Sequence, residues 1–210
     1  MLKSIPSIRI TGPVGGLDTL IFAVDNPVGI AIVAHPNPLQ GGTNTNKVVH
    51  TLAKALNKQG VIAFCPNLRG VGGSEGIHDH GVGEVEDILA VLAYAQAQHP
   101  ELPIILAGFS FGGFVQTFVA NHLHAQGQQV QHLILVGLAA GRYNIALPAV
   151  PADSPVMLIH GEEDEVIPLQ AVVDWARPQK LPVMVIPGVG HFFHGHLPLL
   201  ANTVGRLWSC

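Results

Sequence analysis

The chain has 210 residues, a length that suits one domain with its own core. Hydrophobic residues make up 48% of it and charged residues 11%, which excludes a disordered or repeat-type chain and favours a sheet buried on both faces. The net charge of −4 and the scattered Lys and Arg residues exclude a nucleic-acid-binding protein, because such binding needs a basic surface.

The termini and cysteines bear on location. Residues 1–6 lack the long apolar stretch of a signal peptide, and no apolar run approaches the ~18–20 residues of a membrane span. The two cysteines, Cys65 and Cys210, make no disulfide framework, and we expect no disulfide between them. We therefore predict a cytoplasmic protein that does not bind membranes.

The predicted elements begin with two antiparallel strands, at about 5–10 and 18–24, joined by a glycine-rich turn at 12–16. Strands and helices then alternate. The further predicted strands are 29–34, 61–65, 103–107, 132–136, 156–160 and 183–186; the predicted helices are 46–59, 84–98, one starting at Ser110, 169–176 and 197–208. This alternation predicts one α/β domain over 1–210, with a mostly parallel sheet covered by helices on both faces.

The sequence Gly108-Phe109-Ser110-Phe111-Gly112 follows the predicted strand 103–107 and opens a helix. A serine at such a sharp turn has an exposed hydroxyl, and the two glycines let the chain pass without Cβ clashes. The helix N-terminus favours negative charge that develops beside it. We predict Ser110 as a nucleophile; the alternative is a serine that merely occupies a turn.

The loops after residues 160 and 186 hold the partners that such a serine needs. The first reads Gly161-Glu162-Glu163-Asp164-Glu165, and the second contains Gly188-Val189-Gly190-His191. Their positions place serine, acid and histidine in the chain order of the α/β-hydrolase fold. In a parallel sheet, these loops lie at the carboxyl ends of the strands, where functional sites gather.

Over nearly its whole length the sequence resembles the α/β-hydrolase superfamily, and in particular the small bacterial serine hydrolases without a lid, which are classed as esterases. The matching segments are His35-Pro36, Gly41-Gly42, Asn46-Lys47-Val48-Val49, Arg69-Gly70-Val71-Gly72, Gly108-Phe109-Ser110-Phe111-Gly112 and His191-Phe192-Phe193-His194. Those relatives often carry a second histidine in the first loop, where this chain has Asn37.

The resemblance implies a triad of Ser110, His191 and Asp164. His191 would act as the general base and Asp164 would accept its other ring proton. His194 is the rival base, and we expect it to support the loop instead. Asp164 precedes Val166-Ile167-Pro168, the turn that usually follows the family's acid, and we expect the neighbouring glutamates to be solvated.

An oxyanion hole needs two backbone N–H donors. Phe111, just after the nucleophile, is the predicted first donor. Pro36 and Pro38 have no N–H, so the first loop leaves Asn37 and Leu39 as candidates for the second. The resemblance favours Asn37; the alternative is a rigid proline turn without a catalytic part.

Residues 137–155 are too few for a helical lid, so we predict an open, shallow site with Arg142 and Tyr143 at its edge as substrate-binding residues. The expected function is a carboxylesterase for short-chain or accessible acyl esters of small molecules. A thioesterase, a peptidase with the same triad, and a non-catalytic binding protein are the alternatives. No phosphate-binding loop or complete set of metal ligands is present, so we expect no cofactor and no metal. The chain would act as a monomer or a homodimer.

Overall fold

The computed structural model of the chain describes residues 5–207, which form an eight-stranded sheet in the order β1-β2-β4-β3-β5-β6-β7-β8. Its strands are β1 (Ser7–Gly12), β2 (Gly15–Phe22), β3 (Gly29–Ala34), β4 (Val61–Pro66), β5 (Ile104–Phe109), β6 (Val130–Val136), β7 (Val156–Gly161) and β8 (Val183–Ile186). Strand β2 is antiparallel to β1 and β4, whereas β3 to β8 run parallel to one another.

The chain passes from β3 outward to β4 and then returns across β3 to β5. The loops after β3 and β5 therefore leave the sheet in opposite directions, which opens a crevice at the carboxyl ends of these strands. Every residue of β3, β4 and β5 is buried, as expected for central strands covered on both faces.

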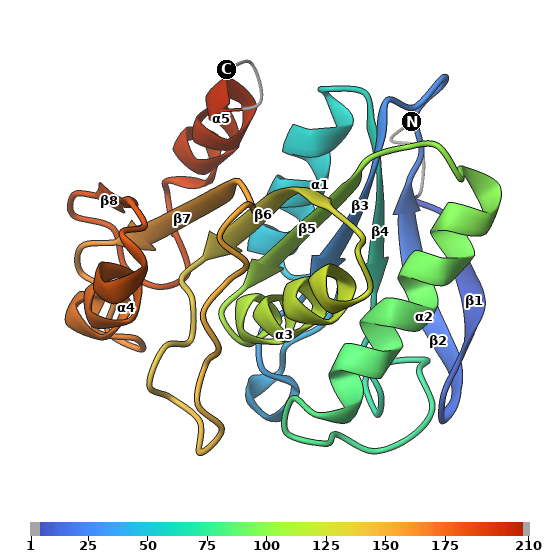
Figure 1. Cartoon of the computed structure of the whole chain (residues 1–210), viewed down its shortest axis with the longest axis horizontal. Coiled ribbons are helices and arrows are strands. Elements are labelled where there is room, and N and C mark those ends of the chain that lie inside the picture. The colour runs from blue at the N-terminus through green and yellow to red at the C-terminus, as the bar shows by residue number, and fades with distance from the viewer. Residues whose placement is uncertain (1–4, 208–210) are drawn as a thin grey trace.

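The helices form a layer on each side of this sheet. In Figure 1, α2 (Gly83–Gln98) and α3 (Phe111–Ala125) lie in front of it, and α1 (Lys47–Asn57) lies behind it and packs with α5 (Leu197–Leu207). The remaining helix, α4 (Leu169–Ala176), lies near β7 and β8, and short 3₁₀ turns occupy η1 (Pro38–Gln40) and η2 (Arg177–Gln179). Two hydrophobic cores result, one on each face of the sheet.

Helix α1 illustrates how local sequence produces these elements. Asn46 caps its N-terminus, where Oδ1 accepts a hydrogen bond from the N–H of Val48 at 2.8 Å. Apolar residues at helical spacing, among them Leu52 and Leu56, are buried against the sheet. None of the helices within residues 5–207 is long and apolar enough to cross a bilayer.

The predicted α/β class, with a mostly parallel sheet covered by helices on both faces, is confirmed. All the predicted strands and helices are present, with ends that differ by a few residues. The largest difference is at the first hairpin, where Gly12 already pairs with Gly15 and the turn is correspondingly shorter than expected. The predicted end of the last helix at 208 and Cys210 lie outside the described residues; Cys65 is a buried free thiol.

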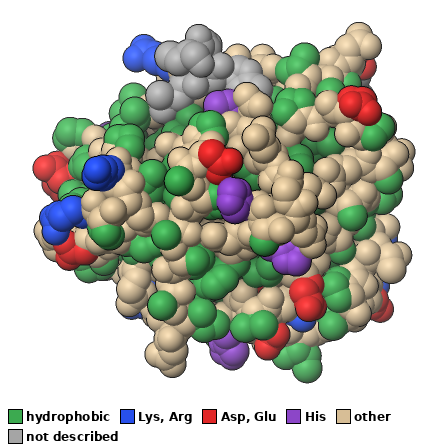
Figure 2. Space-filling view, in the orientation of Figure 1, with side chains coloured by type: hydrophobic (Ala, Val, Ile, Leu, Met, Phe, Trp, Pro, Cys, Tyr) green, Lys and Arg blue, Asp and Glu red, His purple; other side chains and the backbone are tan. Residues whose placement is uncertain are grey.

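On the face drawn in Figure 2, hydrophobic and uncharged side chains dominate, and most Lys and Arg side chains lie toward its margin.

The loops after β3, β4 and β6 gather at the bottom of Figure 1, on the opposite side from the chain ends.

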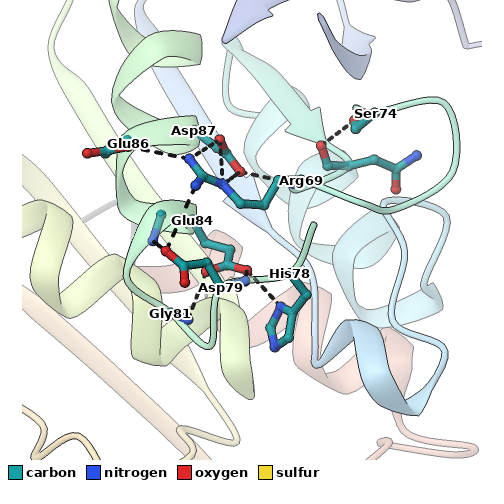
Figure 3. A network of polar contacts seen from close by, with 10 residues as sticks. Arg69, Ser74, His78, Asp79, Gly81, Glu84, Glu86 and Asp87 are labelled. Carbon is teal, nitrogen blue, oxygen red and sulfur yellow. Dashed lines mark hydrogen bonds and ion pairs between the residues drawn. The ribbon is translucent and has the colours of Figure 1, made fainter. Parts of the chain in front are cut away.

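A buried ion pair fixes the loop of residues 67–82, between β4 and α2 (Figure 3). The Arg69 side chain contacts Asp87 of α2 through Nε at 3.0 Å and Nη2 at 2.9 Å, and the Arg69 backbone N–H donates to the same carboxylate. Asp87 is fully buried, whereas Glu86, 3.5 Å from Nη2, is exposed. The loop is thus fastened to the helix through one buried charge pair.

Buried Glu84 fastens the far end of this loop. Its carboxylate accepts hydrogen bonds from the backbone N–H groups of Asp79 and Gly81, each at 2.7 Å, and lies 2.7 Å from His78 Nδ1 (Figure 3). Glu84 and Asp87 lie near the N-terminal end of α2, where the helix dipole favours negative charge. The structure shows that both also hold the preceding loop in place.

We expect Asp87→Asn to lower the free energy of unfolding by about 3 kcal/mol, because it leaves the buried Arg69 charge without its partner. The matched control is Glu86→Gln, which removes an exposed partner of the same guanidinium and should cost less than about 1 kcal/mol. Urea unfolding of both variants measures the difference. Equal losses would contradict the assigned role of the buried pair.

Candidate active site

Ser110 sits between β5 and α3 in a strained backbone conformation, with φ 54° and ψ −113°. Its N–H donates to the Val136 carbonyl at 2.9 Å. Two glycines are required by close backbone approach: a Cβ on Gly108 would lie 2.4 Å from the carbonyl carbon of Gly112, and one on Gly112 would lie 2.2 Å from the Ala34 carbonyl oxygen. This is the strand–turn–helix geometry expected from the sequence.

The structure brings the three predicted residues Ser110, His191 and Asp164 into contact. His191 Nε2 lies 3.1 Å from Ser110 Oγ, and His191 Nδ1 lies 2.7 Å from Asp164 Oδ2. All three are buried, with Ser110 5% exposed. The rival histidine, His194, is exposed and stacks on the ring of Phe192.

The Asp164 carboxylate is held on both oxygens. Oδ1 accepts the backbone N–H groups of Val166 at 2.9 Å and Ile167 at 2.7 Å, which leaves Oδ2 for His191. Burial raises the pKa of Asp164, but the hydrogen bonds from His191 and Ile167 outweigh it and hold that pKa below its usual value. The carboxylate is therefore ionised at neutral pH and is oriented before any substrate arrives.

Two of the glutamates expected to be solvated also hold the histidine loop. Glu162 and Glu165 are exposed, as expected. A carboxylate oxygen of Glu162 accepts the N–H of Gly188 at 2.9 Å, and one of Glu165 accepts the N–H of His191 at 3.1 Å. The acid loop therefore supports the His191 loop through its backbone as well as through Asp164, a role that sequence reasoning missed.

His35, at the end of β3, joins the loops after β3 and β4. Nδ1 lies 2.7 Å from the Pro36 carbonyl oxygen and must donate to it, whereas Nε2 accepts the N–H of Leu68 at 3.0 Å. Both roles require a neutral ring. Burial lowers the pKa of His35 to about 4, so the ring stays neutral well below neutral pH.

The two candidate oxyanion donors in the first loop differ in availability. The N–H of Leu39 donates to Asn37 Oδ1 at 2.9 Å and is engaged in this local turn. The N–H of Asn37 has no hydrogen-bond partner among residues 5–207, and the same holds for the N–H of Phe111 at the start of α3. Of the residues considered, Asn37 and Phe111 therefore have free donors.

Aromatic side chains surround the nucleophile. Tyr143 packs edge-on against Phe111 and Phe114, with ring centroids 5.5 and 4.9 Å apart. His78 packs against Phe111 from the loop after β4. Tyr143 thus contacts residues that flank Ser110, whereas Arg142 is exposed beside it.

We expect His35 to make stability depend on pH between about 6.5 and 4. Its folded-state pKa lies below the unfolded value of 6.5, so the unfolded state binds more protons in this window and stability falls as the pH falls. The loss should reach about 3 kcal/mol near pH 4 and should be absent in His35→Asn. Denaturant unfolding of both proteins across this window tests the expectation; parallel curves would refute it.

Comparisons with known proteins show the family to which the chain belongs. The family model described as serine aminopeptidase, S33, matches residues 38–150. An uncharacterized protein of Rickettsia prowazekii is 31% identical over 200 residues, which cover 90% of this chain and 82% of the relative.

Two solved bacterial structures are similar along nearly the entire chain. An α/β serine hydrolase homologue from Coxiella burnetii is 38% identical, with a TM-score of 0.86 and 98% of both chains covered. XC6422 from Xanthomonas campestris, described as an α/β serine hydrolase without lid, is 35% identical, with a TM-score of 0.87 over 99% of this chain and 96% of that one. The protein therefore belongs to the α/β-hydrolase superfamily, within its S33-type family of serine hydrolases.

Proposed function

We propose that the protein is a carboxylesterase that cleaves short-chain or accessible acyl esters through an acyl-enzyme on Ser110. The observation that carries this proposal is the hydrogen-bonded series from Ser110 Oγ to His191 Nε2 and from His191 Nδ1 to Asp164 Oδ2, at 3.1 and 2.7 Å. A serine hydroxyl is a weak nucleophile at neutral pH, and a base within hydrogen-bond reach activates it.

In the first step, Ser110 Oγ attacks the acyl carbonyl carbon while His191 Nε2 takes the hydroxyl proton. The resulting imidazolium faces the ionised Asp164 carboxylate, which stabilises its charge and keeps the ring in the required tautomer. His191 then gives the proton to the departing alcohol oxygen. In the second step, water attacks the acyl-enzyme with His191 again as base, and the acid and free Ser110 are released.

The oxyanion of each tetrahedral intermediate would be held by the N–H groups of Phe111 and Asn37. Both donors are free, and Phe111 adds the positive end of the α3 dipole. His35 contributes indirectly, because its bonds to Pro36 O and Leu68 N hold the first loop against its neighbour.

The preference for accessible esters rests on the site's surroundings. Residues 137–155 form no helix, so this segment supplies no helical cover over the serine. Two exposed apolar side chains are close in sequence to proposed site residues. Leu39, 68% exposed, follows Asn37 by two residues, and Phe192, 41% exposed, directly follows His191. Exposed apolar side chains of this kind suit an uncharged acyl group. Tyr143 and Arg142 are the proposed contacts for the rest of the substrate.

Matched substrates separate the alternatives. Activity on p-nitrophenyl acetate with little on the acetyl thioester or on an aminoacyl p-nitroanilide supports the esterase. A preference for the thioester or the anilide would instead establish a thioesterase or the aminopeptidase activity that the family model's description names. Binding without turnover of any of the three would favour the non-catalytic reading.

We expect a fluorophosphonate probe to label Ser110 and no other residue, with the site identified by peptide mass spectrometry. Ser110→Ala and His191→Ala should each lower ester hydrolysis by about 10⁴-fold or more, since the triad acts as a unit. His194→Ala serves as the control and should retain labelling. Folded wild-type protein that neither reacts with the probe nor hydrolyses esters would refute the proposal.

The oxyanion donor of the first loop has its own test. Asn37 has φ −52°, which proline can adopt, so Asn37→Pro removes the N–H at a compatible backbone angle. We expect kcat to fall about 10²–10³-fold, as for loss of one oxyanion donor. Asn37→Ala keeps the N–H and loses only the side chain, so it should fall far less. Equal losses in the two variants would assign the effect to the side chain.

A further inference from the structure

A second histidine, His160, lies behind the Asp164 carboxylate and has no part in the reaction described above. It belongs to the end of β7, four residues before Asp164, and is fully buried. Its Nε2 lies 2.9 Å from the Ile167 carbonyl oxygen and 3.3 Å from Asp164 Oδ2, the oxygen that faces His191.

The surroundings of His160 assign its proton. Both neighbours of Nε2 are acceptors, so Nε2 carries a hydrogen. The other ring nitrogen, Nδ1, is buried and has no hydrogen-bond partner among residues 5–207, so a hydrogen there would be unsatisfied. The ring is therefore neutral with its proton on Nε2. Burial, which lowers the pKa of His160, agrees with this assignment.

We propose that His160 is a positioning residue for the acid of the triad. Its single Nε2–H faces both Ile167 O and Asp164 Oδ2, and so links the two ends of the 164–167 turn. The backbone donors of this turn hold Oδ1, while His191 and His160 together face Oδ2. The carboxylate cannot rotate without losing one of these contacts, so Oδ2 stays directed at His191 Nδ1.

The same contact moderates the charge on Oδ2. The ionisable groups that face His160 are Asp164 on the following loop and His191 on the loop after β8; Glu165 acts beyond them, on the backbone N–H of His191. A hydrogen directed at Oδ2 withdraws some of the negative charge that would otherwise act on the imidazole. His160 thus acts on His191 through the shared Asp164 carboxylate, without contacting the substrate. This inference rests on the proposed function, in which Asp164 is the acid of the triad.

Two substitutions separate this role from simple packing. His160→Gln keeps an N–H near the position of Nε2, whereas His160→Leu removes it and fills similar space. His50→Leu, on α1, is the control for removing a histidine outside the site. The readouts are the downfield proton NMR signal of the His191 Nδ1–H and the pH profile of kcat/KM for p-nitrophenyl acetate.

In His160→Leu we expect the NMR signal to shift or broaden and kcat to fall about tenfold, with KM little changed. The acid limb of the kcat/KM profile should move to higher pH, because the unmoderated carboxylate stabilises the imidazolium more strongly. His160→Gln should restore most of the activity and the wild-type profile, and His50→Leu should match the wild type.

An unchanged NMR signal and pH profile in His160→Leu would overturn the proposal. Equal changes in His160→Leu and His160→Gln would also overturn it, since they would point to ring packing alone. Failure of the proposed function can be told apart from failure of this inference. If the proposed function is wrong, the wild-type protein lacks probe labelling and ester turnover, and the NMR comparison still tests the contact between His160 and Asp164.

Discussion

The close contact of backbone between β5, α3 and β3 is the constraint on which the site depends. Gly108 and Gly112 let the first turn of α3 pass against the end of β5 and against the Ala34 carbonyl. This contact forces Ser110 to a positive φ, at a cost of about 1–3 kcal/mol. The fully buried strands β3 and β5 stabilise the arrangement, so the packing of the sheet centre offsets the strain at the nucleophile.

Around this rigid centre, the loops are held by polar side chains, of which Arg69, Asp87 and His35 are buried and Glu162 and Glu165 are exposed. Arg69 and Asp87 fasten the loop after β4, His35 ties that loop to the one after β3, and the acid loop supports the His191 loop through Glu162 and Glu165. The chain has few charged residues, and several of those that are buried make these contacts between loops. A buried charge is tolerated only when it is paired, so each such contact specifies one geometry for its loop.

The features that could be predicted from the sequence are those encoded locally. Alternating apolar runs with turns between them predicted the strands and helices, and the glycines around Ser110 predicted its sharp turn. His35, His160 and Arg69 escaped prediction because their roles depend on partners brought close only by folding. The choice between Asn37 and Leu39 as oxyanion donor could be made in part from the sequence. Asn side chains often accept the N–H two residues on, a local signal that could have marked the Leu39 amide as engaged.

Residues 137–155 form no helix that could close over Ser110. In an enzyme with a mobile cover, closure keeps an acylated intermediate away from other nucleophiles until water has reacted. In the proposed acyl-enzyme, no helical cover of this kind would keep the acyl group on Ser110 away from alcohols or amines in the surrounding solution. Hydrolysis by water and acyl transfer to an alcohol or amine would then compete according to the concentration and reactivity of each nucleophile. The ratio of the two products would depend on the solution as much as on the protein.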